Sequence, residues 1–177
     1  MKLNSSRLRR TNPGELNTNQ NKKNEIYIIL DNVLDTYNVG AVFRLADATA
    51  AKKIFLCGYT ETPPNTRIKK SSINTVDLTE WEHYAQTTDA IKELKTQNSK
   101  LKIIAVEQSI ESIPYTEADY SYPVALIIGN ETHGVSEDVL KLCDQIVELP
   151  MLGVNISINT MVALAIVLYK TLEINNL

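Results

Sequence analysis

The fold class is decided by residues 25–58, which read EIYIILDNVLDTYNVGAVFRLADATAAKKIFLCG. The stretch begins with the apolar run Ile26–Leu30, which is typical of a buried strand. Residues 38–50 then carry apolar side chains at helical spacing, with Asn38 as a candidate N-cap, and Lys53–Gly58 form a second apolar run. A strand, a helix and a strand in this order predict a β-α-β unit in a parallel sheet.

The same alternation continues to the end of the chain. Further strands are predicted at residues 80–84, 102–108, 124–130 and 145–150, and helices at residues 65–73, 87–97, from about Ser136, and 157–173. The run Val124–Asn130 is continuously apolar at its start, which favours burial on both faces of a parallel sheet. The sequence therefore predicts an α/β domain over residues 25–177, with a mostly parallel sheet flanked by helices.

A basic tail precedes this domain. Residues 1–24 hold six basic side chains and a single acidic one, although the whole 177-residue chain has a formal net charge of -3. The tail is rich in Asn, Ser and Thr and has too little apolar surface to fold alone, so we expect it to be flexible. The tail is either a solvated terminus or an arm that becomes ordered when it binds RNA. The rest of the chain has a net negative charge, which argues against a generic basic nucleic-acid binder.

Several other classes of protein are disfavoured by what the sequence lacks. No apolar leader or long apolar run is present, so we expect a cytoplasmic protein with no membrane partner. Cys57 and Cys143 lie far apart in apolar contexts, which favours buried free thiols over a disulfide. His83 and His133 share no ligand spacing with each other or with the cysteines, so no metal site is predicted.

The last predicted helix is apolar on more than one side. Its apolar residues cannot all face one sheet; they are Ile158, Met161, Val162, Ala165, Ile166, Leu168, Tyr169 and Leu172. A helix that is apolar nearly all round needs a second partner. In so small a chain we expect that partner to be another subunit, which predicts a homodimer built through the C-terminal helix.

Three polar clusters follow the ends of predicted strands, where open parallel sheets place their ligands. They span residues 38–44, 129–134 and 150–159. The first strand is not followed by the glycine pattern of dinucleotide-binding folds, and Val135 stands where a nucleotide-binding P-loop has lysine. Ordinary dinucleotide and nucleoside triphosphate sites are therefore disfavoured.

Each cluster taken singly also has a purely structural interpretation. Asn38 and Ser157 could be helix caps, and Gly129 and Gly134 could serve tight turns. Arg44 lies in an otherwise apolar helical run, where a surface ion pair is the plainer alternative.

Taken together, the clusters carry a family resemblance. The motifs are NVGAVFRLADA from Asn38, LIIGNETHGVS from Leu126 and ELPMLGVNISINTMVALAIVLY from Glu148. In order and spacing, the region from about Ile26 to Leu172 resembles the SpoU-type (TrmH-like) RNA 2′-O-ribose methyltransferases of the SPOUT class. The chain departs from the usual third motif in having Ile and Met where that motif commonly has Leu and Ser.

The resemblance implies a C-terminal deep trefoil knot, a rare exception to the rule that chains avoid knots. It also implies S-adenosyl-L-methionine as cofactor, bound by Val106, Glu107, Gly129, Leu149, Met151 and Ile158. For Gly129 there is a physical reason as well, because the absence of Cβ permits close approach of a ligand.

The resemblance further implies a catalytic pocket made of Asn38, Arg44, Glu131, Ser157 and Asn159. Because a guanidinium stays protonated in proteins, we expect Arg44 to act as a bidentate donor that holds a phosphate and stabilises charge on the 2′-oxygen. Ser157 and Asn159 would then orient Arg44 and the hydroxyl, and Glu131 would fix Arg44 or the pocket loop.

The expected activity is methylation of a ribose 2′-hydroxyl in structured RNA, with tRNA favoured and rRNA as the alternative. Recognition would use the dimer surface, the basic tail and Arg67, Lys69 and Lys70. Two further alternatives stay open: a knotted module that binds RNA without turnover, and a base methyltransferase of the same class.

Overall fold

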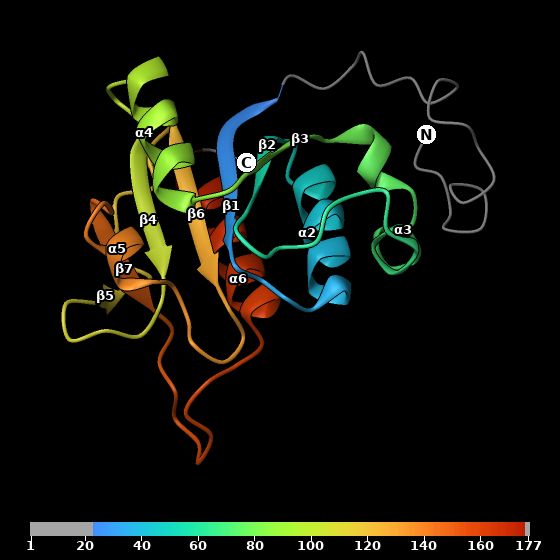
Figure 1. The fold of residues 1–177 in the computed structure, drawn as a ribbon. Coiled ribbons are helices and arrows are strands. Elements are labelled where there is room, and N and C mark those ends of the chain that lie inside the picture. Colours follow the sequence, from blue (N-terminus) through green and yellow to red (C-terminus); the bar gives the residue numbers. More distant parts are fainter. Residues whose placement is uncertain (1–22, 176–177) are drawn as a thin grey trace.

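The computed structural model describes residues 23–175, and these form one seven-stranded sheet (Figure 1). Its strands are β1 (Asn24–Asp31), β2 (Ala51–Cys57), β3 (Glu80–Tyr84), β4 (Lys102–Val106), β5 (Ile113–Pro114), β6 (Val124–Gly129) and β7 (Gln145–Glu148). The spatial order is β3-β2-β1-β6-β4-β7-β5, and every pair of neighbours is parallel. All carboxyl ends therefore meet at one edge.

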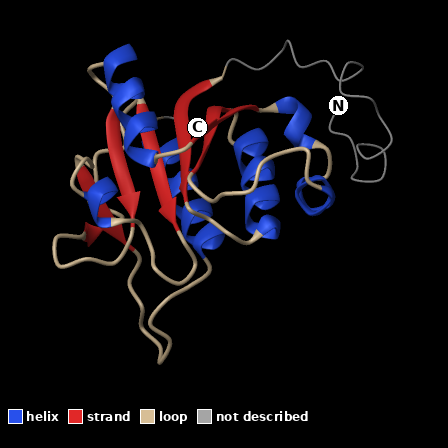
Figure 2. Ribbon diagram, viewed as in Figure 1, coloured by secondary structure: helices blue, strands red, loops and turns tan. Residues whose placement is uncertain are grey.

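Helices cover both faces of the sheet (Figure 2). They are α2 (Thr36–Ala48), α3 (Thr66–Ser72), the 3-10 helix η3 (Thr75–Leu78), α4 (Thr87–Gln97), α5 (Glu137–Leu140) and α6 (Thr160–Ile174). Along β1, Ile28 and Leu30 pack in the core beneath α2 and α6, whereas Ile29 packs in the core beneath α4 and α5. Successive strand residues point to opposite faces, so a continuous apolar run serves both cores.

The connections diverge where β1 and β6 lie side by side. The chain leaving β1 enters α2 on one face, and the chain leaving β6 enters α5 on the other. The last residues of these strands, Asp31 and Gly129, are register partners. Divergence of this kind opens a crevice at the carboxyl edge, which is where ligands bind in such sheets.

The predicted α/β class and the parallel sheet are confirmed, but three helix details are wrong. Asp35, rather than Asn38, is the N-cap of α2: its carboxylate accepts a hydrogen bond from the Tyr37 amide at 2.8 Å. Asn38 lies inside the helix and is buried. Similarly, α6 starts at Thr160 behind the N-cap Asn159, so Ser157 precedes the helix.

The helix predicted from Ser136 ends after one turn at Leu140. The sequence also gave no signal for the two-residue strand β5 or for η3. The strands predicted to reach Gln108 and Pro150 end earlier, at Val106 and Glu148. Residues that follow these ends, such as Glu107 and Leu149, line a cavity.

Other expectations concern the cysteines, metals and membranes. Both cysteines are free thiols; Cys57 is buried and Cys143 is half-buried, and burial raises the pKa of each thiol to about 12. Within residues 23–175, no helix has the length and apolarity to cross a membrane, and no group of acidic, histidine or cysteine side chains could hold a metal. The predicted flexible tail lies almost wholly outside the described residues.

We expect Gly40→Ala to destabilise the fold by about 2 kcal/mol, because α2 and α3 pack closely at this position. A Cβ atom there would lie 1.9 Å from Ser71 Oγ and 2.7 Å from the Ile68 carbonyl oxygen. Urea denaturation would measure the change. Gly153→Ala is the matched control, since nothing lies within 4 Å of its Cβ position, and an equal loss in both variants would contradict the packing explanation.

Candidate active site

A cavity of about 440 Å³ opens at the carboxyl edge of the sheet, beside the ends of β4, β6 and β7. Its walls come from three segments: the residues after β4, the turn after β6, and the long segment between β7 and α6, which projects beyond the sheet edge in Figure 1. The lining residues are Val106, Glu107, Gln108, Gly129, Asn130, Glu131, Thr132, Gly134, Val147, Glu148, Leu149, Met151, Ile156, Ser157, Ile158, Asn159, Thr160 and Ala163.

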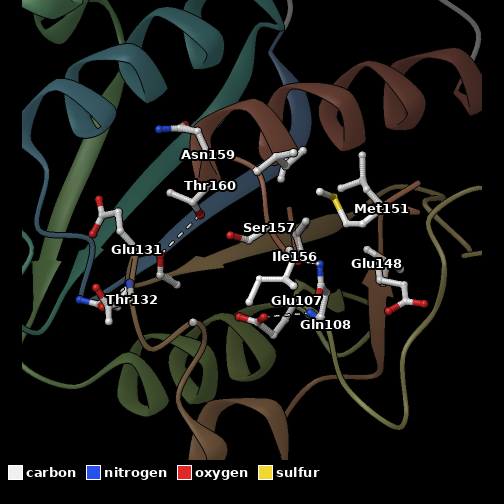
Figure 3. Close-up of a pocket in the computed structure, with 18 residues that line it drawn as sticks. Glu107, Gln108, Glu131, Thr132, Glu148, Met151, Ile156, Ser157, Asn159 and Thr160 are labelled. Carbon is white, nitrogen blue, oxygen red and sulfur yellow. Dashed lines mark hydrogen bonds between the residues drawn. The ribbon is translucent and has the colours of Figure 1, made fainter. Parts of the chain in front are cut away.

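The structure gathers most of the predicted site residues around this cavity. All six predicted cofactor residues line it: Val106, Glu107, Gly129, Leu149, Met151 and Ile158. Of the predicted catalytic residues, Glu131, Ser157 and Asn159 line it, whereas Asn38 and Arg44 do not. In Figure 3, Glu131 and Asn159 lie on one side of the cavity, and Glu107, Gln108 and Glu148 lie toward the other.

Asn38 is joined to the cavity through hydrogen bonds. Its amide Nδ2 donates to Glu131 Oε1 at 3.0 Å, and its Oδ1 accepts from Asn159 Nδ2 at 3.0 Å. Asn159 Oδ1 in turn accepts from the amides of Met161 and Val162 at the start of α6. One polar chain thus ties α2, the turn after β6 and the start of α6 together.

Glu131 is an anchor for the loop before α2. Its carboxylate accepts hydrogen bonds from the backbone amides of Leu34 and Asp35, each at 3.0 Å, as well as from Asn38. Partial burial raises the pKa of Glu131, but these three donors outweigh it and the net pKa lies below the ordinary value. A carboxylate held in this way is a weak base, so its geometry suits positioning better than proton abstraction.

Gly129 is required by the protein's own backbone. A Cβ atom there would lie 2.1 Å from the carbonyl carbon of Gly134 and 2.2 Å from the amide nitrogen of Val135. The turn folds back because Asn130 and Gly134 exchange two backbone hydrogen bonds. The predicted reason for this glycine, room for a ligand, is therefore incomplete: the returning turn already excludes a side chain.

The opposite wall is fixed by the residues that follow β4. Glu107 accepts from the amides of Val135 and Gln108, each at 2.8 Å. The Gln108 side chain donates to the Ile156 carbonyl at 2.8 Å and so holds the segment before α6 against the end of β4. Gln108 and Thr160 are lining residues that the sequence analysis missed; their only signal was that they adjoin predicted positions.

Ser157 and Arg44 have no partner within the described part of the chain. Ser157 is exposed at the cavity, and no hydrogen bond involves its side chain there. Arg44 is exposed on α2, two turns beyond the half-exposed Tyr37, and it forms no ion pair among residues 23–175. The surface ion pair considered for Arg44 is thus not found there, and its guanidinium is available to a ligand or another chain.

The cavity suits a small, positively charged organic ligand. Its volume falls within the usual range for small-molecule sites, and Val106, Leu149 and Met151 supply apolar surface. Glu107 and Glu148 are carboxylates without a lysine or arginine beside them in the lining. That charge favours a cation and disfavours a phosphate.

Comparison with known proteins identifies relatives of this architecture. The model of the SpoU rRNA Methylase family matches residues 25–169. The tRNA (guanosine(18)-2'-O)-methyltransferase of Aquifex aeolicus is 29% identical over 155 residues, which cover 85% of this chain and 70% of that protein. The Escherichia coli protein of the same name is 27% identical over 149 residues, covering 82% of this chain and 62% of its own length.

A solved structure described as an AdoMet-bound rRNA methyltransferase from Sinorhizobium meliloti matches with a TM-score of 0.79 at 27% identity. The match covers 96% of this chain and 60% of that one. The chain therefore spans less than two thirds of the length of several relatives.

We expect Glu131→Gln to lower the free energy of unfolding by about 1 kcal/mol at neutral pH, because hydrogen bonds to a charged acceptor are lost. A lowered native pKa stabilises the fold above the unfolded pKa, near 4.5, and this stabilisation disappears as the pH falls through the native value. The difference between wild type and variant should therefore shrink on acidification.

Denaturation with urea at pH 7 and at successively lower pH would measure this difference. Glu111→Gln is the control, since no hydrogen bond or ion pair involves the exposed Glu111 side chain within the described residues. A difference for Glu131→Gln that grew on acidification would refute the anchoring role.

Proposed function

The chain belongs to the SpoU rRNA Methylase family, and from that premise we propose that it transfers the methyl group of S-adenosyl-L-methionine to a ribose 2′-hydroxyl in structured RNA. The observation that carries this proposal is the chain of hydrogen bonds from Asn38 through Glu131 and Asn159, which joins three distant motifs at one cavity. tRNA is the proposed substrate class because the Aquifex and Escherichia relatives are named for it; rRNA, named for the Sinorhizobium protein, is the alternative.

The cavity is the proposed cofactor site. S-adenosyl-L-methionine supplies an electrophilic methyl group on a positively charged sulfonium. Val106, Leu149, Met151 and Ile158 would pack against its apolar parts, and the carboxylate of Glu107 would complement its charge. Because Glu107 is held by two backbone amides, it is oriented before the cofactor arrives.

In the proposed reaction the protein orients the hydroxyl and stabilises the charge that develops on it. Ser157, exposed at the cavity without a partner in the described chain, would contact the ribose hydroxyl. Arg44 would hold the neighbouring phosphate and the 2′-oxygen as a bidentate donor. Asn38, Glu131 and Asn159 would act as positioning residues, since their side chains are already engaged with one another.

We propose a homodimer built on α6 and the adjoining α2. The side of α6 away from the sheet carries Val162, Ile166 and Tyr169, which are 43%, 37% and 50% exposed. Leu34 and Tyr37, at the start of α2, are 54% and 52% exposed, and α2 contacts α6. So much apolar surface on two touching helices favours a partner subunit.

This dimer suggests where Arg44 acts. Arg44 lies on the same exposed face of α2 as Tyr37, outside the cavity of its own chain. Ile158 both lines the cavity and is 40% exposed just before the start of α6, so a partner seated on α6 would lie at the cavity mouth. We infer that Arg44 of one subunit completes the cavity of the other.

Other parts of the proposal concern the chain as a whole. The methyltransferase domain spans residues 25–177, and its C-terminal part is proposed to thread into a trefoil knot. The support for the knot is that α6 returns to contact β4 and β6 after the chain has left β7. We propose a cytoplasmic location, because the RNA substrates lie there, and RNA contacts through the tail and through Arg67, Lys69 and Lys70, which are exposed on α3.

We expect the purified protein to transfer radiolabelled methyl groups from S-adenosyl-L-methionine to an unmodified tRNA transcript, with rRNA transcripts in parallel. Arg44→Ala should lower kcat by about 100-fold or more without weakening cofactor binding, because it removes donors that act on developing charge. Arg44→Lys should remain impaired, since lysine cannot bind bidentately.

Nuclease digestion would locate the methyl group on sugar or base. A base product would favour the alternative chemistry, and cofactor binding with no transfer to either RNA would favour the non-catalytic module. Near-full activity of Arg44→Lys would refute the bidentate role.

A mixing experiment tests the action of Arg44 across the dimer. Inactive Arg44→Ala and Ser157→Ala proteins are unfolded together in equal amounts and refolded. Activity should return to about a quarter of the wild-type value, because half of the dimers then contain one intact composite site. If Arg44 acted within its own subunit, no activity would return; wild type treated in the same way controls for refolding.

A further inference from the structure

A second hollow, of about 640 Å³, lies at the same edge of the sheet and has no part in the proposed cofactor site. It is bounded by the ends of β1, β2 and β3 and by the starts of α4 and α5. A smaller hollow of about 250 Å³ adjoins it, and both are bordered by Gly58, Tyr59 and His83.

The two larger cavities share a wall. Asn130, Glu131, Thr132 and Gly134 line the proposed cofactor site, and residues 136–139 of the same segment line the second hollow. The wall is bound to the residue that follows β1, because Asn130 Nδ2 donates to the Asn32 carbonyl at 2.9 Å. A polynucleotide strand that enters one cavity would therefore pass close to the other.

The floor of the second hollow is rigid. Asp31 is 1% exposed, and its carboxylate accepts hydrogen bonds from the Thr87 hydroxyl, the Asn32 amide group, and the backbone amide and hydroxyl of Ser136. These bonds join the end of β1 to the starts of α4 and α5. Because the Asp31 carboxylate already accepts these four hydrogen bonds, a ligand in the hollow would be bound by the side chains around the rim.

Tyr59 stands at that rim and is 83% exposed. Its backbone is held by the neighbouring turn, because the Tyr59 amide donates to Asn32 Oδ1 at 3.1 Å. Asn32 itself adopts a left-handed backbone conformation with φ 56, which is uncommon for a residue other than glycine. His83 also borders the hollow, and its Nε2 lies 3.2 Å from the Gly58 carbonyl oxygen.

The chemistry of the hollow selects against phosphate and for a nucleobase. No lysine or arginine lines it, whereas Glu137 and Asp138 do, and Asp138 is paired with Lys141 at 3.1 Å. Glu137 is exposed without a side-chain partner among the described residues. A carboxylate accepts hydrogen bonds from the amino and imino groups of a base edge, and an exposed aromatic ring offers a face for stacking.

We propose that this hollow seats one unpaired base of the RNA substrate, stacked on Tyr59 with its edge toward Glu137. The inference depends on the proposed function for the nature of the RNA. The reacting ribose would occupy the neighbouring cavity, on the other side of the shared wall, so the hollow would help to select which nucleotide is presented.

The test measures RNA binding separately from catalysis. Fluorescein-labelled, unmodified tRNA transcript is titrated with wild type and with Tyr59→Ala, Tyr59→Leu and Tyr59→Phe, and anisotropy is recorded at two salt concentrations. Tyr59→Ala and Tyr59→Leu should raise Kd about tenfold, whereas Tyr59→Phe should stay within about twofold, because the aromatic ring provides the stacking. Glu137→Gln should raise Kd less.

Two readouts separate base contact from general damage. The dependence of Kd on salt should be unchanged in Tyr59→Ala, because no phosphate contact is lost, and binding of S-adenosyl-L-methionine should match wild type. A Kd within twofold of wild type for Tyr59→Ala, or a weaker salt dependence, would overturn the proposal.

The outcomes also distinguish this proposal from the proposed function. RNA that binds in a Tyr59-dependent manner but is never methylated would leave the base site standing and refute the enzyme. Methylation of an RNA whose binding does not depend on Tyr59 would support the enzyme and refute the base site. If wild type bound neither the tRNA transcript nor rRNA transcripts, the base site would be refuted.

Discussion

The hydrogen bonds that Glu131 accepts hold together the segments at the carboxyl edge of the sheet. Glu131 lies in the turn after β6, and its three donors all belong to the loop before α2 or to α2 itself. Through Asn38 the same network reaches Asn159, which caps α6. Segments about a hundred residues apart are thus fixed against each other by three hydrogen bonds to a carboxylate and one between two amide side chains.

The parallel sheet explains why this network lies where it does. All strands end at one edge, and the connections from β1 and β6 leave toward opposite faces. The turn after β6 must therefore cross between the two sides, and it becomes the wall between two cavities. Its tight return, which leaves no space for a Cβ at Gly129, allows both cavities to lie close to one another.

The distribution of charge is compatible with the proposed RNA substrate and the proposed cationic cofactor. Carboxylates line both cavities, whereas the basic side chains Arg44, Arg67, Lys69 and Lys70 are exposed on α2 and α3. Phosphates would then be bound on the outer helices, and a ribose or base would enter between them. A net charge of -3 is compatible with RNA binding when the positive side chains are gathered in this way.

The sequence by itself determined the fold class, and nine of the eleven residues that it singled out for the candidate site line the cavity. Apolar runs such as Val124–Ile128 require burial on both faces, and polar residues that follow strands collect at one edge of a parallel sheet. Local patterns could not determine which of several polar residues caps a helix, because Asp35 competes with Asn38, and Asn159 with Ser157, at similar spacing.

Only the tertiary structure decided what depends on contacts between distant segments. It showed that Gly129 meets the backbone of residues 134–135, that Asn38 is linked to the cavity by hydrogen bonds to Glu131 and Asn159, and that Arg44 does not line the cavity of its own chain. It also revealed the hollow beside Tyr59, which is assembled from four separate stretches of sequence. Hydrogen bonds and cavities of this kind arise from packing in three dimensions, and no local pattern in the chain encodes them.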